Sequence, residues 1–403
     1  MDNKNNRLIG GILLVAGTAT GAGMLALPVV TSFGGFFPSI GVFFLCWAFM
    51  LVSAFFFLDV NIAVRGEPNL VSMAGKTLGL FGKVVSWIFY LLLLYALLAA
   101  YIAGCTPLFE TAFESLFHIV FPKWFSPFVL PFLFGGFVYL GTKKVDYLNR
   151  ILMIGLICSY FLIIGYCPSF IEPSYLFHVD VFASLFAVPI VITSFGYHII
   201  IPTLTTYMNH DVKRLRWTLL IGSSIPFVIY LLWQWIVLGA VPLSDLIGAW
   251  KQGLPASAPL SKVVSAKWVG TAAQFFSFFA IVTSFLGVAL SLSDFLTDGL
   301  RIKKTWEGRI FAICLTFIPP LVFVFSYQKS FYIALEYAGV FVSVLLGILP
   351  SLMVLKIKKH AFYQSMGGKS LVLLVILFFF SVIAINFLEK QNLLNFLIDS
   401  YLH

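Results

Sequence analysis

Small and hydroxyl-bearing residues gather in one apolar stretch near the N-terminus. Residues 17–28 read GTATGAGMLALP, with LIGGILLVA before them and VVTSFGGFF after them. Glycine costs a helix interior about 1 kcal/mol relative to alanine, so a helix that only crosses a bilayer gains nothing from it. Where a helix is broken, freed N–H groups can bind a carboxylate, and freed carbonyl groups can bind a cation or an ammonium group. The stretch therefore predicts a break that binds a small zwitterion such as an amino acid.

A second stretch of this kind reads FAVPIVITSFGYHIIIPTLTTYM. When the two stretches are aligned on the prolines that follow them, Ser194 meets Thr20 and Gly196 meets Ala22. Paired interrupted helices in two halves of opposite orientation are typical of transporter binding sites. The alternatives are a simple kink and close helix packing, which small residues also serve.

We expect the substrate to contact both breaks. The backbone groups would come from small residues, and aromatic side chains would stack on an aromatic substrate. The predicted substrate-binding residues are Thr18, Ala19, Gly21, Ala22, Gly23, Ser194, Phe195, Gly196 and Tyr197, with Tyr95 on the same wall.

Ionisable residues inside apolar segments are candidates for ion coupling and gating. His198 lies beside the second break and titrates near neutral pH, which suits proton coupling; a hydrogen-bonded histidine of the helix bundle is the alternative. Glu336 could gate the external mouth or accept a proton, or it could lie at the membrane surface. Arg7 and Asp298 could pair to close the inner mouth, although solvated interfacial charges are the alternative.

Eleven apolar spans must position these residues, which predicts an all-α polytopic membrane protein with a single transmembrane domain over residues 1–403. A repeat with an odd number of helices ends on the opposite side of the membrane, so the second copy has the opposite orientation. We therefore expect two inverted five-helix repeats, over residues 8–167 and 179–355, and an extra helix over residues 369–389. The broken helices are the first and the sixth. The predicted spans are residues 8–33, 36–64, 82–105, 126–142, 146–167, 179–208, 216–239, 268–299, 306–327, 330–355 and 369–389.

Composition and charge agree with this assignment. The 403 residues are 61% hydrophobic and only 10% charged, whereas roughly a quarter of a soluble protein is charged. Most of the 25 Lys and Arg fall in alternate loops, which predicts a cytoplasmic N-terminus and an external C-terminus. The net charge of +9 is thus spread over several loops and does not form a nucleic-acid-binding patch. The basic residues of the predicted external loops are Lys123, Lys251, Lys262, Lys267, Lys329 and Lys390.

Other classes of membrane protein fit less well. Membrane enzymes usually cluster His, Asp or Cys near one membrane face, whereas the six histidines of this chain are scattered singly. A channel is a further alternative, but paired broken helices favour a carrier. We therefore expect no enzyme activity, no metal and no cofactor, with an amino acid and the lipid bilayer as partners. The sequence carries no signal for an oligomeric state.

Four stretches together resemble one family, the hydroxy and aromatic amino acid permeases. They are GTATGAGMLALP, TSFGYHIIIPTLTTYM, KRLRWTLLIGSSIPFVIYLLWQ and SLSDFLTD. The resemblance covers essentially the whole chain and is closest to bacterial tyrosine and tryptophan carriers. It implies the amino acid–polyamine–organocation fold, the bacterial inner membrane, and import of an aromatic amino acid by proton symport and alternating access. Tyrosine is preferred over tryptophan on overall resemblance.

A more distant resemblance, to sodium-coupled transporters of the same fold, implies a cation site between the first and eighth helices. The stretches that carry it are VAGTATGAG and AIVTSFLG. It would use the carbonyls of Gly17, Thr20 and Ala280 and the hydroxyls of Thr283 and Ser284. Sodium coupling is therefore the alternative to proton coupling. The second sodium site of those transporters needs an amide side chain where this chain has Met24, a poor ligand for a hard cation.

Overall fold

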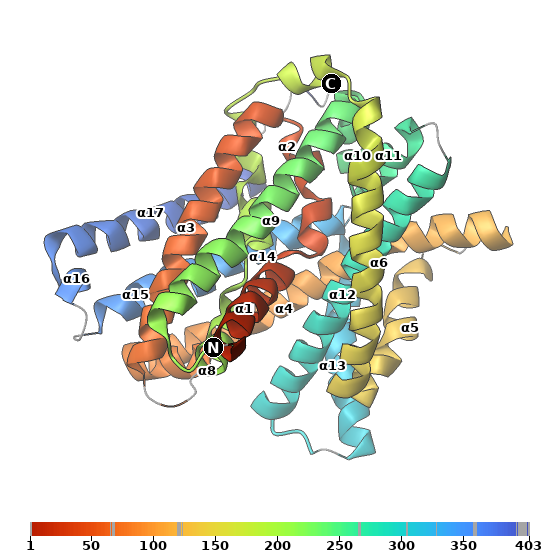
Figure 1. Ribbon diagram of the computed structural model, residues 1–403. Helices are drawn as coiled ribbons and strands as arrows, with labels where there is room; N and C mark the ends of the chain where they lie inside the picture. The colour runs from red at the N-terminus through yellow and green to blue at the C-terminus, as the bar shows by residue number, and fades with distance from the viewer. Residues whose placement is uncertain are drawn as a thin grey trace.

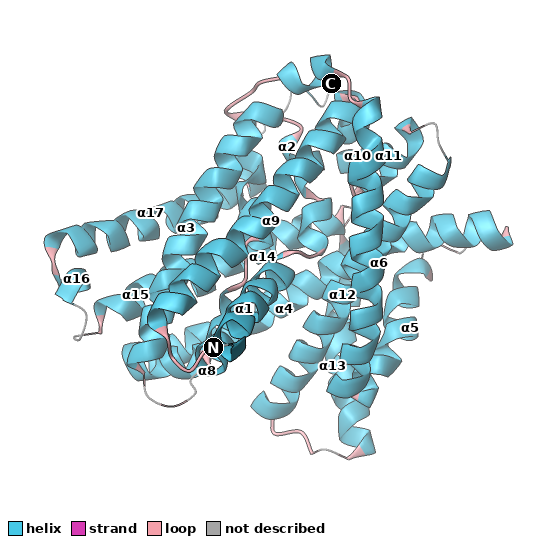
Figure 2. Cartoon of the chain, in the orientation of Figure 1, coloured by secondary structure: helices cyan, strands magenta, loops and turns pink. Residues whose placement is uncertain are grey.

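The protein is entirely helical in the part of the chain that the structure describes (Figures 1 and 2). This computed structural model describes residues 2–64, 66, 69–118, 122, 124–264, 267–303, 305–327, 329–357, 361–391, 393 and 401. The predicted all-α membrane fold is confirmed. In the described ranges, nine helices are long and apolar enough to cross a membrane. The two remaining predicted spans correspond to shorter apolar helices, Arg7–Ala19 and Ser126–Leu140, so eleven crossings and the inverted repeat stay predictions.

The elements follow one another along the chain in this order: α1 (Asp2–Ala19), η1 (Ala22–Leu25), α2 (Leu27–Thr31), α3 (Phe36–Ala63), α4 (Leu70–Phe117), α5 (Ser126–Leu140), α6 (Thr142–Tyr166), η2 (Cys167–Phe170), η3 (Pro173–Phe177), η4 (Ala183–Ala187), α7 (Val188–Ser194), η5 (His198–Ile200), α8 (Ile201–Tyr207), α9 (Val212–Ala240), α10 (Leu243–Gln252), α11 (Ser257–Val263), α12 (Lys267–Gly299), α13 (Trp306–Ser326), α14 (Ser330–Val342), η6 (Ser343–Ile348), α15 (Leu349–Leu355), α16 (Ala361–Gln364) and α17 (Met366–Lys390).

The first apolar span is broken where the sequence predicts it. Helix α1 ends at Ala19, and Gly21 is extended with φ −149° and ψ −168°. A short 3₁₀ turn, η1, and then α2 continue the span, with Pro28 in the first turn of α2. Proline is favoured there because its missing N–H would have had no helical partner.

The sixth predicted span is broken in the same way. Helix α7 ends at Ser194, and Phe195 and Tyr197 leave helical geometry, with φ −100°, ψ 22° and φ −106°, ψ 0°. The chain re-enters a helix through η5, and Pro202 lies in the first turn of α8. Both broken spans are therefore pairs of half-helices joined by irregular backbone.

Helix α4 is longer than the predicted span over residues 82–105. It starts at Leu70, where the side chain of Asn69 accepts a hydrogen bond from the Ser72 N–H. Gly79 has φ +72° and divides α4 into two helices, because only glycine adopts this conformation without strain. The first piece lies at the predicted cytoplasmic end, and the second crosses the bundle.

The two breaks lie inside the bundle and not at its rim. The η1 turn packs against α12 and α7, α1 packs along α9, and α14 packs against α7 and α4. Figure 1 shows α1 and α9 running side by side through the centre of the molecule. Helices α4, α9, α12 and α14 thus form the frame that holds both breaks.

The segment between α9 and α12 forms two short helices that cover one end of the bundle. Figure 1 shows α10 and α11 at the end opposite the N-terminus. The Ala256 N–H donates a 2.9 Å hydrogen bond to the Leu25 carbonyl oxygen, directly above η1. On the same cap the Lys329 ammonium lies 3.6 Å from the centre of the Trp250 ring, and burial lowers the pKa of this ammonium. We call α10, α11 and the residues between them, which include Ala256, the external cap, since the sequence predicts this end to be outside.

Candidate functional site

The two predicted breaks come into direct contact. A β-carbon added to Gly23 of the first broken span would lie 2.7 Å from Oγ of Ser194 in the second. The structure therefore places the proposed backbone groups of both spans in one site. We call the irregular backbone at Thr20–Ala22 and Phe195–Tyr197, with the helix ends beside it, the break site.

Tyr230 of α9 joins the two breaks. Its hydroxyl oxygen lies 2.6 Å from the Ala19 carbonyl oxygen and 2.9 Å from the Ser194 carbonyl oxygen. Ala19 is the last residue of α1 and Ser194 is the last residue of α7, so both carbonyls belong to helix C-termini, which carry partial negative charge. Three residues along, the Trp233 indole Nε1–H donates a 3.1 Å hydrogen bond to the Met24 carbonyl oxygen.

The sequence analysis did not assign Tyr230 or Trp233 to the site. Their signal is present in the stretch IPFVIYLLWQ, where Tyr230, Trp233 and Gln234 fall at i, i+3 and i+4 on an otherwise apolar helix. Side chains at this spacing share one face of a helix. The Gln234 amide also reaches the broken span, where it donates to the Thr31 hydroxyl.

Ser284 of α12 contacts the break site, whereas the hydroxyl of its neighbour Thr283 bonds within α12. The Ala22 N–H donates a 3.1 Å hydrogen bond to Oγ of Ser284, and a β-carbon on Gly21 would lie 2.8 Å from the same oxygen. The Thr283 hydroxyl donates within its own helix, at 2.8 Å to the Phe279 carbonyl oxygen.

The other residues proposed for a cation site are spread over α1 and α12. The Thr20 N–H donates a 2.9 Å hydrogen bond to the Ala16 carbonyl oxygen in the last turn of α1. Gly17 lies on the exposed side of α1. Ala280 is fully buried, and its carbonyl oxygen lies 3.2 Å from the Thr283 hydroxyl. Among the proposed ion ligands, Ser284 is therefore the one whose side chain bonds to the backbone of the break.

Two other candidates bond away from the break site. The Thr18 hydroxyl donates a 2.7 Å hydrogen bond to the Leu14 carbonyl oxygen on its own helix, and Thr18 is exposed. The Tyr95 hydroxyl donates a 2.9 Å hydrogen bond to the Leu315 carbonyl oxygen of α13.

The aromatic residues of the second break are fully buried. Phe195 meets the Tyr230 ring edge-on, with ring centres 5.3 Å apart. The centre of the Tyr197 ring lies 5.1 Å from the centre of the His198 ring. The Phe57 ring of α3 meets the same imidazole edge-on, with ring centres 6.1 Å apart. Neither ring nitrogen of His198 has a hydrogen-bond partner in the described part of the chain.

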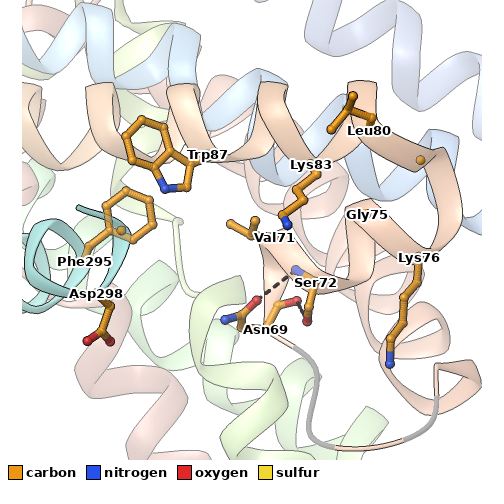
Figure 3. A pocket seen from close by; sticks show the side chains of 12 residues that line it. Asn69, Val71, Ser72, Gly75, Lys76, Leu80, Lys83, Trp87, Phe295 and Asp298 are labelled. Carbon is orange, nitrogen blue, oxygen red and sulfur yellow. Dashed lines mark hydrogen bonds between the residues drawn. The ribbon is translucent and has the colours of Figure 1, made fainter. Parts of the chain in front are cut away.

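The proposed gate residues lie at opposite ends of the bundle. Glu336 of α14 is buried and pairs with Lys390 of α17, at 2.6 Å between Nζ and Oε2. Asp298 lies at the other end, exposed in a cavity of about 730 Å³ that Lys83 and Trp87 also line (Figure 3). The ion pairs among the described residues do not include one between Arg7 and Asp298 in this conformation.

An ion pair that was not predicted lies at the same end as Asp298. Both carboxylate oxygens of the buried Asp59 accept from Nη2 of Arg216, at 3.0 and 3.2 Å. The Tyr363 hydroxyl donates to the same carboxylate at 2.5 Å. This network ties α3, α9 and α16 together where the sequence predicts the cytoplasmic end.

Exposed polar positions on α12 lead from the break site toward that end. Gly287, Ser291, Asp294 and Asp298 are all exposed and recur every three or four residues after Ser284. A polar stripe is unfavourable against lipid, so water is expected along it. In contrast, Leu25 to Val29 on the other side of the break are fully buried beneath the external cap.

Comparison with known proteins agrees with the transporter fold. The chain is 32% identical over 406 residues to the tyrosine-specific transport system 1 of Haemophilus influenzae, covering 98% of this chain and 100% of that protein. It is 30% identical over 396 residues to the tryptophan-specific transport protein of the same organism, covering 94% and 95%. A solved structure of the Eremococcus coleocola manganese transporter has a similar fold, with a TM-score of 0.61 at 15% identity over 98% of this chain and 92% of that one.

A family assignment follows from the extent of these matches. The Tryptophan/tyrosine permease family matches residues 4–386, which include both breaks, Tyr230 and Ser284. The relatives named above are transport proteins, as the two broken helices predict. The chain belongs to the tryptophan/tyrosine permease family and is a membrane transporter of amino acids, not an enzyme.

Proposed function

We propose that the protein imports an aromatic amino acid, with tyrosine preferred, by proton symport and alternating access in the bacterial inner membrane. The observation that carries the proposal is the meeting of two helix breaks at Tyr230 and Ser284. The identity of about 32% with a protein named as a tyrosine-specific transport system supports the substrate class.

The break site offers both kinds of partner that an amino acid needs. The carbonyls of Ala19 and Ser194 end two half-helices and suit an ammonium group, and the Ala22 N–H, at the start of η1, suits a carboxylate. Phe195 and Tyr197 supply aromatic surface on the second break. The substrate's ring would pack against such surface with favourable stacking energy.

Alternating access is supported by the unequal covering of the two ends. The external cap bonds to η1 through Ala256 and Leu25, whereas the polar stripe from Gly287 to Asp298 is exposed. We therefore assign this conformation to the state that is closed outside and open toward the cytoplasm. The external cap would have to separate from η1 for substrate to enter.

We favour proton coupling over sodium coupling because of the hydrogen bonds that the Thr283 and Ser284 hydroxyls make. The Ser284 oxygen accepts from the Ala22 N–H of the first break, which leaves it less available to a cation. His198 is buried next to the second break and is our first candidate for the proton carrier. Glu336, paired with Lys390, is the second.

Uptake by the purified protein in proteoliposomes tests the proposal. Labelled tyrosine, tryptophan and phenylalanine are offered under an inward proton gradient, an inward sodium gradient, or neither. We expect tyrosine to accumulate under the proton gradient without sodium. Sodium-dependent accumulation at constant pH would instead assign Thr283 and Ser284 to a sodium site, and higher uptake of tryptophan would reverse the preference.

A further inference from the structure

The Tyr230 hydroxyl is placed where two half-helices end. It contacts the terminal carbonyls of both α1 and α7, at 2.6 Å to Ala19 and 2.9 Å to Ser194. A phenol has one proton, so at any moment it donates to only one of two oxygens that both need a donor. Each helix C-terminus carries about half a negative elementary charge, so the pair favours a cation over this neutral hydroxyl.

An amino acid's ammonium group matches these two carbonyls better than the phenol does. It brings a positive charge and three N–H donors, so it can satisfy both oxygens at once. The phenol oxygen already lies within hydrogen-bond distance of both carbonyls, so an ammonium group that bridges the same two oxygens competes with it for this position. We propose that the Tyr230 hydroxyl occupies the ammonium position of the empty carrier and is displaced when an amino acid binds.

Ser284 makes the complementary contact on the other side of the first break. Its oxygen accepts from the Ala22 N–H at 3.1 Å, where a substrate carboxylate oxygen would accept. One hydroxyl thus covers the carbonyls of the break site and another covers an N–H group. Buried backbone groups left without partners are destabilising, so these two hydroxyls stabilise the empty carrier.

This role makes Tyr230 a positioning residue for the empty state, and it rests on the proposed function. Tyr230 is fully buried, and its ring meets Phe195 at 5.3 Å, so the hydroxyl moves only if α9 or the second break moves. Binding of the ammonium group would therefore be coupled to a shift of α9 relative to α1 and α7. The carrier that returns empty would need the hydroxyl back in place.

The substitution Tyr230→Phe tests the proposal because it removes only the hydroxyl. Binding of labelled tyrosine and of its deamino analogue 3-(4-hydroxyphenyl)propionate is measured on the purified full-length protein. We expect the variant to bind tyrosine about two- to tenfold more tightly, the equivalent of one competing hydrogen bond. The analogue has no ammonium group, so its affinity should not change.

Transport provides a second readout that a merely structural role would not change. Net uptake requires the empty carrier to return, whereas exchange of internal for external tyrosine does not. In Tyr230→Phe we expect net uptake to fall several-fold while exchange is retained. The matched control is Tyr160→Phe in α6, which removes a 3.0 Å hydrogen bond from a tyrosine hydroxyl to the Ile229 carbonyl oxygen of α9 and should change neither value.

Weaker binding of tyrosine by Tyr230→Phe, or an equal change for tyrosine and the analogue, overturns the proposal while leaving the transport function intact. If wild-type protein binds and transports none of the aromatic amino acids, the proposed function itself fails, and this inference fails with it. If the variant does not fold, 3-fluorotyrosine incorporated at position 230 keeps the hydroxyl. Its ¹⁹F signal should then shift with tyrosine and not with the analogue, and an unchanged signal with bound tyrosine overturns the proposal.

Discussion

At the scale of single residues, Gly21 has no space for a side chain, because Oγ of Ser284 would lie 2.8 Å from its β-carbon. Substitution by valine would push α12 away from the first break and fill the space expected for the substrate carboxylate. Overpacking of this kind costs about 1–3 kcal/mol, and each 1.4 kcal/mol is tenfold in affinity. We expect Gly21→Val to lower uptake of labelled tyrosine by at least about tenfold.

Gly41 provides the matched control for this substitution. It lies in α3, and nothing comes within 4 Å of a β-carbon added there. Gly41→Val should therefore insert into the membrane and transport like the wild type. Wild-type uptake by Gly21→Val would remove this backbone from the substrate site.

His198 carries the prediction on coupling at the same scale. If it binds the coupled proton, His198→Gln should reduce accumulation under a proton gradient far more than it reduces tyrosine exchange, because exchange needs no net movement of the ion. Both rates are measured in the same proteoliposomes. His210→Asn, in the exposed turn after α8, is the control and should leave both rates unchanged. If accumulation survives His198→Gln with protons still driving it, Glu336 becomes the carrier to test.

At the scale of elements, the external cap should have to leave η1 in each transport cycle. The Ala256 N–H and the Leu25 carbonyl oxygen are 2.9 Å apart, which brings the two α-carbons within about the 4.4–6.8 Å that a disulfide spans. The double substitution Leu25→Cys with Ala256→Cys should form a disulfide on oxidation and stop tyrosine uptake. A reductant should restore uptake in the same sample.

Each single-cysteine variant serves as a control for this cross-link, and oxidation should not affect either of them. The exposed Cys158 and Cys314 are replaced in this background, and the other native cysteines, Cys46, Cys105 and Cys167, are buried and free, so they are not expected to compete for the new thiols. Full cross-linking with undiminished uptake would show that the cap does not need to move away from η1.

At the scale of the whole molecule, the fold alone does not determine which end of the bundle faces the cytoplasm. The loop charges predict that Lys262 of α11 is outside and that Lys303, between α12 and α13, is inside. Both are exposed. In a background with Cys158 and Cys314 replaced, a membrane-impermeant thiol reagent should label Lys262→Cys from outside intact cells and label Lys303→Cys only after lysis. The reverse pattern would invert the topology.

The sequence by itself determined the class of protein and the two breaks. Apolar runs of membrane length leave helices as the only way to pair every backbone group, and glycines followed by a proline mark where a helix cannot continue. Hence the all-helical fold and the ends of α1 and α7 were predicted close to where they lie. The length of α4 was not predicted. Its first piece, before Gly79, is helical but lies outside the apolar run over residues 82–105 from which the span was predicted.

Only the tertiary structure decided which polar groups meet at the break site. Tyr230 is distant from both breaks in sequence, and its role depends on how α9 crosses α1 and α7. The same holds for the pairing of Asp59 with Arg216 and of Glu336 with Lys390, which join helices far apart along the chain. Local sequence specifies where hydrogen bonds are missing, because that depends on neighbours within one helical turn. Which side chains satisfy those groups depends on long-range helix packing, and one chain's residue order does not reveal this.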